Sequence, residues 1–268
     1  MPPRLAVTAV AMSLLTTGAI AQTKPDLAVF AAGSLRVALT EIAQAFEQAE
    51  PGTRLVLTFG ASGLLKDRIQ AGERADVFAS ANMEHPQALA SAGKASTVRR
   101  FARNSLCALA APAIAVTGET LVARMLDPAI KVGTSTPKAD PSGDYAWMMF
   151  ERIEQQGRAG AYKTLAGKSL QLTGGPNSPS PPTGRNIYAA LVASGQADIF
   201  ITYCTNATLA SAEQPTLQVV RVPEPINVSA DYGVTKTLDA PPLATHFVEF
   251  LLGADGQAIL ARHGFSPA

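Results

Sequence analysis

Four short stretches of small and hydroxylated residues lie where strand-like runs give way to helix-like or loop patterns: Gly33-Ser34, Ala61-Ser62-Gly63, Pro141-Ser142-Gly143 and Thr183-Gly184-Arg185-Asn186. A side-chain oxygen at such a position either caps the first helical turn or shares the positive helix end with an external anion. Taken singly, each stretch favours the ordinary cap. Because ligands of open α/β sheets bind beyond the carboxyl ends of the strands, the four together predict a pocket of neutral donors for an anion.

The second of these stretches invites comparison with serine hydrolases. In GASGL at 60–64, Leu64 occupies the place of the last glycine of the nucleophile-elbow motif. A secreted serine hydrolase that uses Ser62 is therefore only a distant alternative.

Metal, nucleotide and acid–base chemistry have little support in the sequence. It contains no Walker A or GxGxxG motif. Asp76 and Asp198 each open a strand after a small residue, which fits turn or capping roles. The histidines lack metal-ligand spacing, and the last of them fits a helix C-terminus: His85, His246 and His263. We expect no enzyme activity, no cofactor and no residue that ligates a metal cation directly.

The N-terminus has the pattern of a secretory signal peptide. Arg4 precedes an apolar run over 5–20, and Ala19-Ile20-Ala21 fits the cleavage rule for small residues. Residues 1–21 are therefore expected to be removed, and the mature protein is expected in the periplasm. No later segment is long and apolar enough to predict a membrane span.

The charge and the cysteine content of the chain further limit which class of protein it can be. Without the leader, 21 basic residues face 21 acidic ones, which argues against a nucleic-acid partner. Cys107 and Cys204 could form a disulfide in an oxidising compartment or remain buried thiols, and the sequence leaves both open. About 247 mature residues suffice for one large domain or two smaller ones.

Strand-like and helix-like segments alternate along most of the chain, which predicts an α/β class with mostly parallel sheets. Strands are expected at 27–30, 55–59, 75–79, 105–111, 130–133, 198–203 and 217–222. Helices are expected at 35–46, 64–71, 145–156, 187–194, 242–252 and 254–263. The segment TGGPNSPSPPTG at 173–184 lacks periodicity and predicts a long loop, either functional or a simple connection.

With these elements in order, the sequence resembles the periplasmic molybdate-binding proteins of ABC importers, a branch of the type II periplasmic binding-protein family. The resemblance covers nearly the whole mature chain. It rests on VFAAGSL at 29–35, FGASGLLKDRIQAGERADVFASAN at 59–82, NSLCALAAP at 104–112, ITYCTNA at 201–207 and GADGQAILARHGF at 253–265. It implies two α/β lobes with a ligand cleft between them, lobe I over 22–105 and 230–268 and lobe II over 106–229.

The resemblance also implies a set of anion ligands. The two first-lobe serines of the family fall on Ser34 and Ser62, a backbone donor of the second lobe falls on Ser142, and a strand-ending tyrosine falls on Tyr203. A further backbone donor falls near Arg185, where the family commonly has an apolar residue.

Arg185 leaves two ligand classes open. Molybdate carries no proton at neutral pH, so donors alone suit it, whereas hydrogen phosphate would also need an acceptor. If the guanidinium of Arg185 points away from the cleft, molybdate or tungstate is expected. If it points inward, a carboxylate, sulfonate or phosphonate becomes the alternative.

The function that the resemblance implies is capture without catalysis. The anion would bind lobe I first, and lobe II would close over it by bending at crossing strands near Ser105 and Tyr232. The closed protein, expected to be a monomer, would deliver its ligand to an ABC permease in the inner membrane.

Overall fold

The computed structural model describes residues 26–179 and 184–268. The predicted signal peptide at 1–21 and part of the Pro-rich loop, residues 180–183, lie outside the described residues. Within that part of the chain, no helix is both long enough and apolar enough to cross a membrane.

Lobe I is built on three parallel strands, β1 (Leu27–Ala32), β2 (Leu55–Gly60) and β3 (Val77–Ser80), with β1 in the middle. Its helices are α1 (Arg36–Ala49), α2 (Ser62–Gln70), α3 (Glu84–Ser91), α9 (Pro242–Leu252) and α10 (Ala254–Arg262). The apolar stripe of α1 predicted from the sequence is buried, and its Phe46 packs edge-on against Phe247 of α9, with ring centroids 5.3 Å apart.

Lobe II repeats this arrangement with β5 (Val132–Ser135) between β6 (Leu170–Thr173) and β7 (Ile199–Tyr203), all parallel. A further strand, β8 (Gln218–Arg221), pairs with β4. The helices of this lobe are α4 (Leu121–Leu126), α5 (Pro141–Gln155), α6 (Ala161–Lys168), α7 (Ile187–Ala193) and α8 (Cys204–Glu213).

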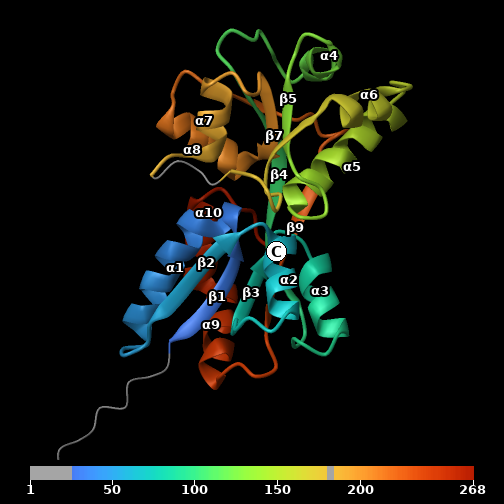
Figure 1. Cartoon of the computed structure of the whole chain (residues 1–268). Coiled ribbons are helices and arrows are strands. Elements are labelled where there is room, and N and C mark those ends of the chain that lie inside the picture. Colours follow the sequence, from blue (N-terminus) through green and yellow to red (C-terminus); the bar gives the residue numbers. More distant parts are fainter. Residues whose placement is uncertain (1–25, 180–183) are drawn as a thin grey trace, which may run out of the picture.

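Two long strands run between the lobes (Figure 1). The first part of β4 (Arg99–Ala110) pairs with β9 (Ser229–Lys236), as far as Ser105 opposite Ser229. From Leu106 onward, β4 pairs instead with β7, where Leu106 lies opposite Tyr203. Every antiparallel pairing between the named strands of the described sheet involves β4 or β9, and the pairings among β1, β2 and β3 and among β5, β6 and β7 are parallel.

The predicted two-lobed α/β architecture is confirmed, although several elements differ from the expectation. The expected strand at 105–111 is the second half of the longer β4, because the apolar pattern begins only there. A 3-10 turn, Gly33–Leu35, precedes α1. The lobe boundaries expected at 105–106 and 229–230 fall inside β4 and at the first residues of β9, and the boundaries themselves stay a prediction.

The two acids expected in turn or capping roles each bind a backbone amide of a neighbouring segment that is distant in sequence. The Asp76 carboxylate accepts a hydrogen bond from the backbone amide of Ala28 at 2.7 Å, and that of Asp198 accepts one from Lys131 at 2.7 Å. Each therefore ties its strand to the chain beside it. His263, which follows α10, has its Nε2 atom 2.7 Å from the Glu41 carboxylate.

Cys107 and Cys204 form a disulfide, which settles the alternative that the sequence left open. The bridge joins the lobe II half of β4 to the first residue of α8, directly after Tyr203. It closes a loop across a sequence separation of 97 residues, so it restricts the unfolded chain strongly.

Reduction of this disulfide is expected to lower the free energy of unfolding by about 4–5 kcal/mol in the chain-entropy model. Urea denaturation with and without a reductant measures the change. The double variant Cys107→Ala/Cys204→Ala serves as control, because the reductant should not shift its unfolding midpoint. Equal midpoints for the oxidised and reduced wild-type protein would contradict the expectation.

Candidate functional site

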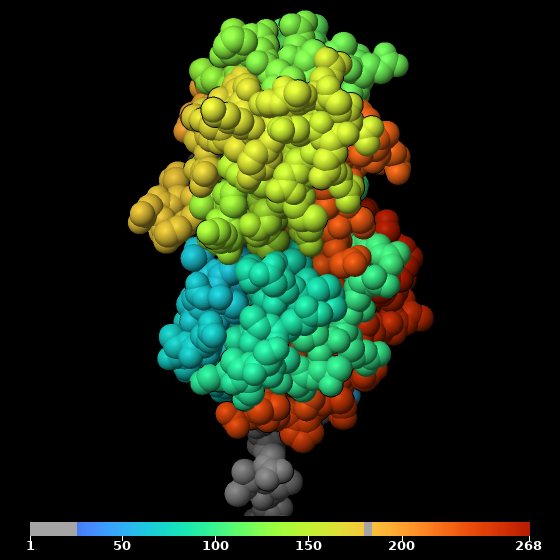
Figure 2. Space-filling model, turned by 90° about the vertical axis from the view of Figure 1, so that its right-hand side faces the viewer, coloured from blue at the N-terminus to red at the C-terminus, as the bar shows by residue number. Residues whose placement is uncertain are grey.

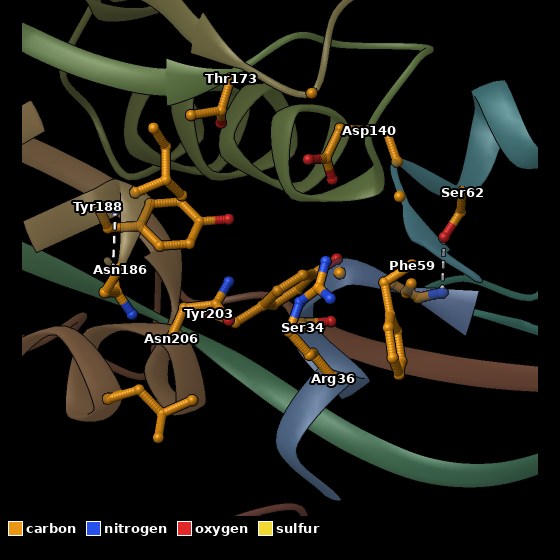
Figure 3. Close-up of a pocket in the computed structure, with 18 of the residues that line it drawn as sticks. Ser34, Arg36, Phe59, Ser62, Asp140, Thr173, Asn186, Tyr188, Tyr203 and Asn206 are labelled. Carbon is orange, nitrogen blue, oxygen red and sulfur yellow. Dashed lines mark hydrogen bonds between the residues drawn. The ribbon is translucent and has the colours of Figure 1, made fainter. Parts of the chain in front are cut away.

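A cavity of about 310 Å³ lies between the lobes, at the carboxyl ends of the strands of both lobes (Figure 3). Four of the five predicted site residues line it: Ser34, Ser62, Arg185 and Tyr203. The fifth, Ser142, is buried at the start of α5 and is absent from the cavity wall among the described residues.

Ser34 lies in the 3-10 turn between β1 and α1, where no side chain caps the turn. Its Oγ atom is 2.8 Å from the Tyr232 hydroxyl, and Asn104 Nδ2 donates to that same hydroxyl at 3.5 Å. Burial raises the pKa of Tyr232, which therefore keeps its proton. If Tyr232 donates that proton to Ser34, the Ser34 hydroxyl is left as a free donor toward the cavity.

Ser62 begins α2, whose N-terminus also lacks a side-chain cap. Its fully buried Oγ atom accepts a hydrogen bond from the backbone amide of Ala81 at 3.1 Å (Figure 3). An acceptor bond of this kind fixes the oxygen but leaves the hydroxyl proton free. Both serines of lobe I can therefore offer an O–H donor to an anion in the cavity.

Tyr203, at the end of β7, supplies a hydroxyl from lobe II. Its oxygen is buried and has no hydrogen-bond partner among the described residues. Burial raises the pKa of Tyr203 well above its ordinary value, so the group is a neutral donor. A buried polar atom without a partner is costly, and a ligand acceptor would satisfy it.

The two backbone donors expected from lobe II, the amide of Ser142 and one near Arg185, lie where side chains of the protein cap the helix starts. The amide of Ser142 donates to Asp140 Oδ1 at 3.0 Å, because Asp140 is the N-cap of α5. The Asn186 side chain likewise caps α7, accepting from the amides of Tyr188 and Ala189 at 3.0 and 3.1 Å. The starts of α5 and α7 are thus capped by side chains of this protein, whereas those carrying Ser34 and Ser62 are not.

Arg185 is held by an acidic neighbour. Its Nε atom donates to Glu213 Oε1 at 2.6 Å, and the amide of Asn186 donates to the other oxygen of the same carboxylate. The hydrogen bond from Arg185 lowers the pKa of Glu213. The guanidinium, half-exposed at the cavity wall, is therefore already paired.

The sequence analysis missed two charged residues of the cavity wall. The exposed guanidinium of Arg36 lies over the Phe59 ring, 4.6 Å from its centroid. Asp140 stands across the cavity on the lobe II side (Figure 3). Asp140 directly precedes Pro141, and proline is favoured as the first residue of a helix, so the sequence could have predicted Asp140 as an N-cap. Nothing in the sequence indicated that it lines the cavity.

The family described as bacterial extracellular solute-binding protein matches residues 27–266. The chain belongs to this family. The resemblance inferred from the sequence is thereby confirmed, and the family is one of solute-binding proteins.

Curated relatives cover almost the whole solute-binding chain. An uncharacterized protein of Pasteurella multocida is 36% identical over 90% of this chain and 98% of its own length. The molybdate-binding protein ModA of Mycobacterium tuberculosis is 30% identical over 90% of this chain and 84% of its own.

Solved structures with low sequence identity share the fold. The periplasmic molybdate-binding protein of Azotobacter vinelandii is 19% identical, with a TM-score of 0.71 over 90% of this chain and 99% of its own. The sulfate-binding protein SubI of Mycobacterium tuberculosis, also 19% identical, gives 0.74 over 91% and 88%. The predicted periplasmic binding-protein fold is confirmed.

The lobes of this solute-binding protein touch beside the cavity. The amide of Gly63 in α2 donates to the Ala139 carbonyl of lobe II at 2.9 Å. A Cβ atom on Gly63 would lie 2.5 Å from the Lys138 carbonyl oxygen and 2.7 Å from that of Ala139. On the face shown in Figure 2, the two lobes lie directly against each other. Only glycine at position 63 permits this approach.

Gly63→Ala is expected to hold the lobes apart and to weaken ligand binding about tenfold, because the contact across the cleft is lost. Small-angle X-ray scattering should give a larger radius of gyration than for the wild type at the same ligand concentration. Gly167→Ala is the matched control, since a Cβ atom there meets nothing within 4 Å. Unchanged scattering and affinity in Gly63→Ala would contradict the prediction.

Proposed function

We propose that this protein captures molybdate or tungstate in the interlobe cavity and delivers it, as a monomer, to an ABC permease of the inner membrane. Membership of the solute-binding family supports the coarse role, and the relative ModA of Mycobacterium tuberculosis supports the choice of anion. The observation that carries the proposal is that the hydroxyl-bearing residues Ser34, Ser62 and Tyr203 line one cavity.

This donor set suits a fully deprotonated oxyanion. Molybdate offers only acceptors at neutral pH, and a hydroxyl whose oxygen is already fixed by the protein can meet it with a proton. Three hydrogen bonds to a charged group, at about 1.5–3 kcal/mol each, sum to about 4.5–9 kcal/mol, which reaches micromolar affinity only at the upper end of the range. Tighter binding needs additional amide donors, and the uncapped starts of α2 and of the turn before α1 offer them.

The ion pair of Arg185 with Glu213 supports an inorganic oxyanion over an organic acid as the ligand. A guanidinium paired with the Glu213 carboxylate has less to offer a ligand carboxylate. Arg36, exposed and stacked on Phe59, supplies a screened charge at the cavity wall. Such a charge favours the approach of an anion more than its retention.

Capture would begin on lobe I, where Ser34 and Ser62 have free donors. Tyr203 would then complete the donor set as lobe II closes. The hinge would lie where β4 exchanges β9 for β7, between Ser105 and Leu106. A hydrolase that uses Ser62 has little support, because none of the described cavity-lining residues is a histidine that could serve as its base.

Calorimetry on ligand-free protein tests the choice of ligand. We expect heat with molybdate and tungstate and none with small carboxylates, sulfonates or phosphonates. Sulfate is included because it has the same tetrahedral oxyanion geometry. Heat with an organic acid, and none with either metal oxyanion, would replace the proposal by its alternative.

Tyr203→Phe is expected to weaken molybdate binding about 10- to 100-fold, because it removes one hydrogen bond to a charged ligand and little else. The Tyr203 oxygen has no partner within the described structure, so the variant should fold normally. Arg185→Met is the comparison, expected to bind within about threefold of the wild type if Arg185 is not a ligand. A large loss in Arg185→Met with little change in Tyr203→Phe would favour an organic anion.

A further inference from the structure

An acid stands in the wall of the proposed anion site. Asp140 is half-buried, lines the cavity, and turns its carboxyl group toward it (Figure 3). Gly174, with φ of +74°, lies against this carboxyl group, where any Cβ atom would collide with it. The loop after β6 therefore leaves room for the acid and does not shield it with a side chain.

No opposite charge neutralises Asp140 among the described residues. Its hydrogen bonds come from neutral groups, the Ser142 amide and the Ser135 hydroxyl. The nearby charge on its own helix is the like charge of Asp144. The titratable groups that face it from α7, β7 and β9 are tyrosines whose pKa values burial raises, so they stay neutral: Tyr188, Tyr203 and Tyr232. The cavity arginines are exposed, and Arg185 is paired with Glu213.

An ionised carboxylate in the cavity wall disfavours binding of a dianion, unless a proton neutralises the carboxylate. An ionised Asp140 would repel a dianion bound at short range in the same cavity. A protonated Asp140 keeps one oxygen as acceptor for the Ser142 amide and presents its O–H as a further donor. Burial raises the pKa of Asp140 to about 6, so little energy is needed to protonate it.

We propose that the oxyanion enters the site together with one proton, which Asp140 holds in the closed complex. The inference rests on the proposed function, because it assigns Asp140 a role in the same site. The proton comes from solvent and returns to it on release. Asp140 thereby acts as a specificity-determining residue that makes retention of the dianion depend on pH.

The direction of the pH dependence follows from the two protonation states. The free site takes up its proton near pH 6, and the bound dianion moves that uptake to higher pH. Affinity is therefore greatest below about pH 6 and falls about tenfold per pH unit above it. From pH 6.5 to pH 8.5 the loss is expected to approach about 100-fold.

Titration calorimetry with molybdate tests this in two buffers of different ionisation heat, at pH 6.5 and 8.5. For the wild type we expect uptake of about one proton per anion at pH 8.5. Asp140→Asn should show no uptake and a nearly constant affinity, and it should fold because asparagine also caps helices. Asp144→Asn, which removes a neighbouring acid outside the cavity wall, should still take up the proton.

Three results would overturn the inference. The first is wild-type binding without proton uptake and with a flat pH profile. The second is uptake that persists in Asp140→Asn, which would place the proton on another group. The third is an Asp140→Asn protein that melts normally but binds molybdate far more weakly at both pH values, which would show that the Asp140 carboxyl group supports binding by some means other than a proton taken up at higher pH. Absence of heat with molybdate and tungstate at both pH values in the wild type would instead remove the proposed function, and this inference with it.

Discussion

The exchange of partners along β4 is the constraint on which the rest of the structure depends. One strand pairs with β9 as far as Ser105 and with β7 from Leu106 onward, so it belongs to both lobes. Because Leu106 lies opposite Tyr203, the exchange point sets the position of the lobe II hydroxyl relative to lobe I. Next to this point, the disulfide between Cys107 and Cys204 links β4 covalently to the start of α8. Bending at this point would therefore move the Tyr203 hydroxyl together with lobe II, without changing its contacts inside that lobe.

The chemistry of the cavity depends on serine hydroxyl groups that hydrogen bonds within the protein already hold in place. Ala81 donates to Ser62, and Tyr232 lies within hydrogen-bond distance of Ser34, so each serine is held in place. The hydroxyl proton of each serine then remains available to donate a hydrogen bond to an oxyanion. Preorganisation of this kind also lowers the entropic cost of binding, because the donors do not have to be ordered by the ligand.

The sequence carried enough information for the lobe I half of the site. There a strand, a turn of small residues and a helix follow one another within a few positions, so local pattern sufficed to place Ser34 and Ser62 at helix starts. The pattern could not place β9, whose partners lie more than 100 residues away along the chain. It also gave no signal that Asp140 belongs to the site, because the fold alone brings this residue to a cavity shared with lobe I.

The contrast between the helix ends gives the two lobes different roles. Asp140 and Asn186 occupy amides at the starts of α5 and α7, so lobe II has fewer free donors for an anion. The starts that carry Ser34 and Ser62 have no such caps, so under the proposed function lobe I would bind the anion while the cleft is open. Lobe II then contributes the Tyr203 hydroxyl, which has no partner within the described structure until a ligand arrives. Under the proposed function, satisfying this buried oxygen would favour closure, and Asp140 would oppose closure over a dianion until it is protonated.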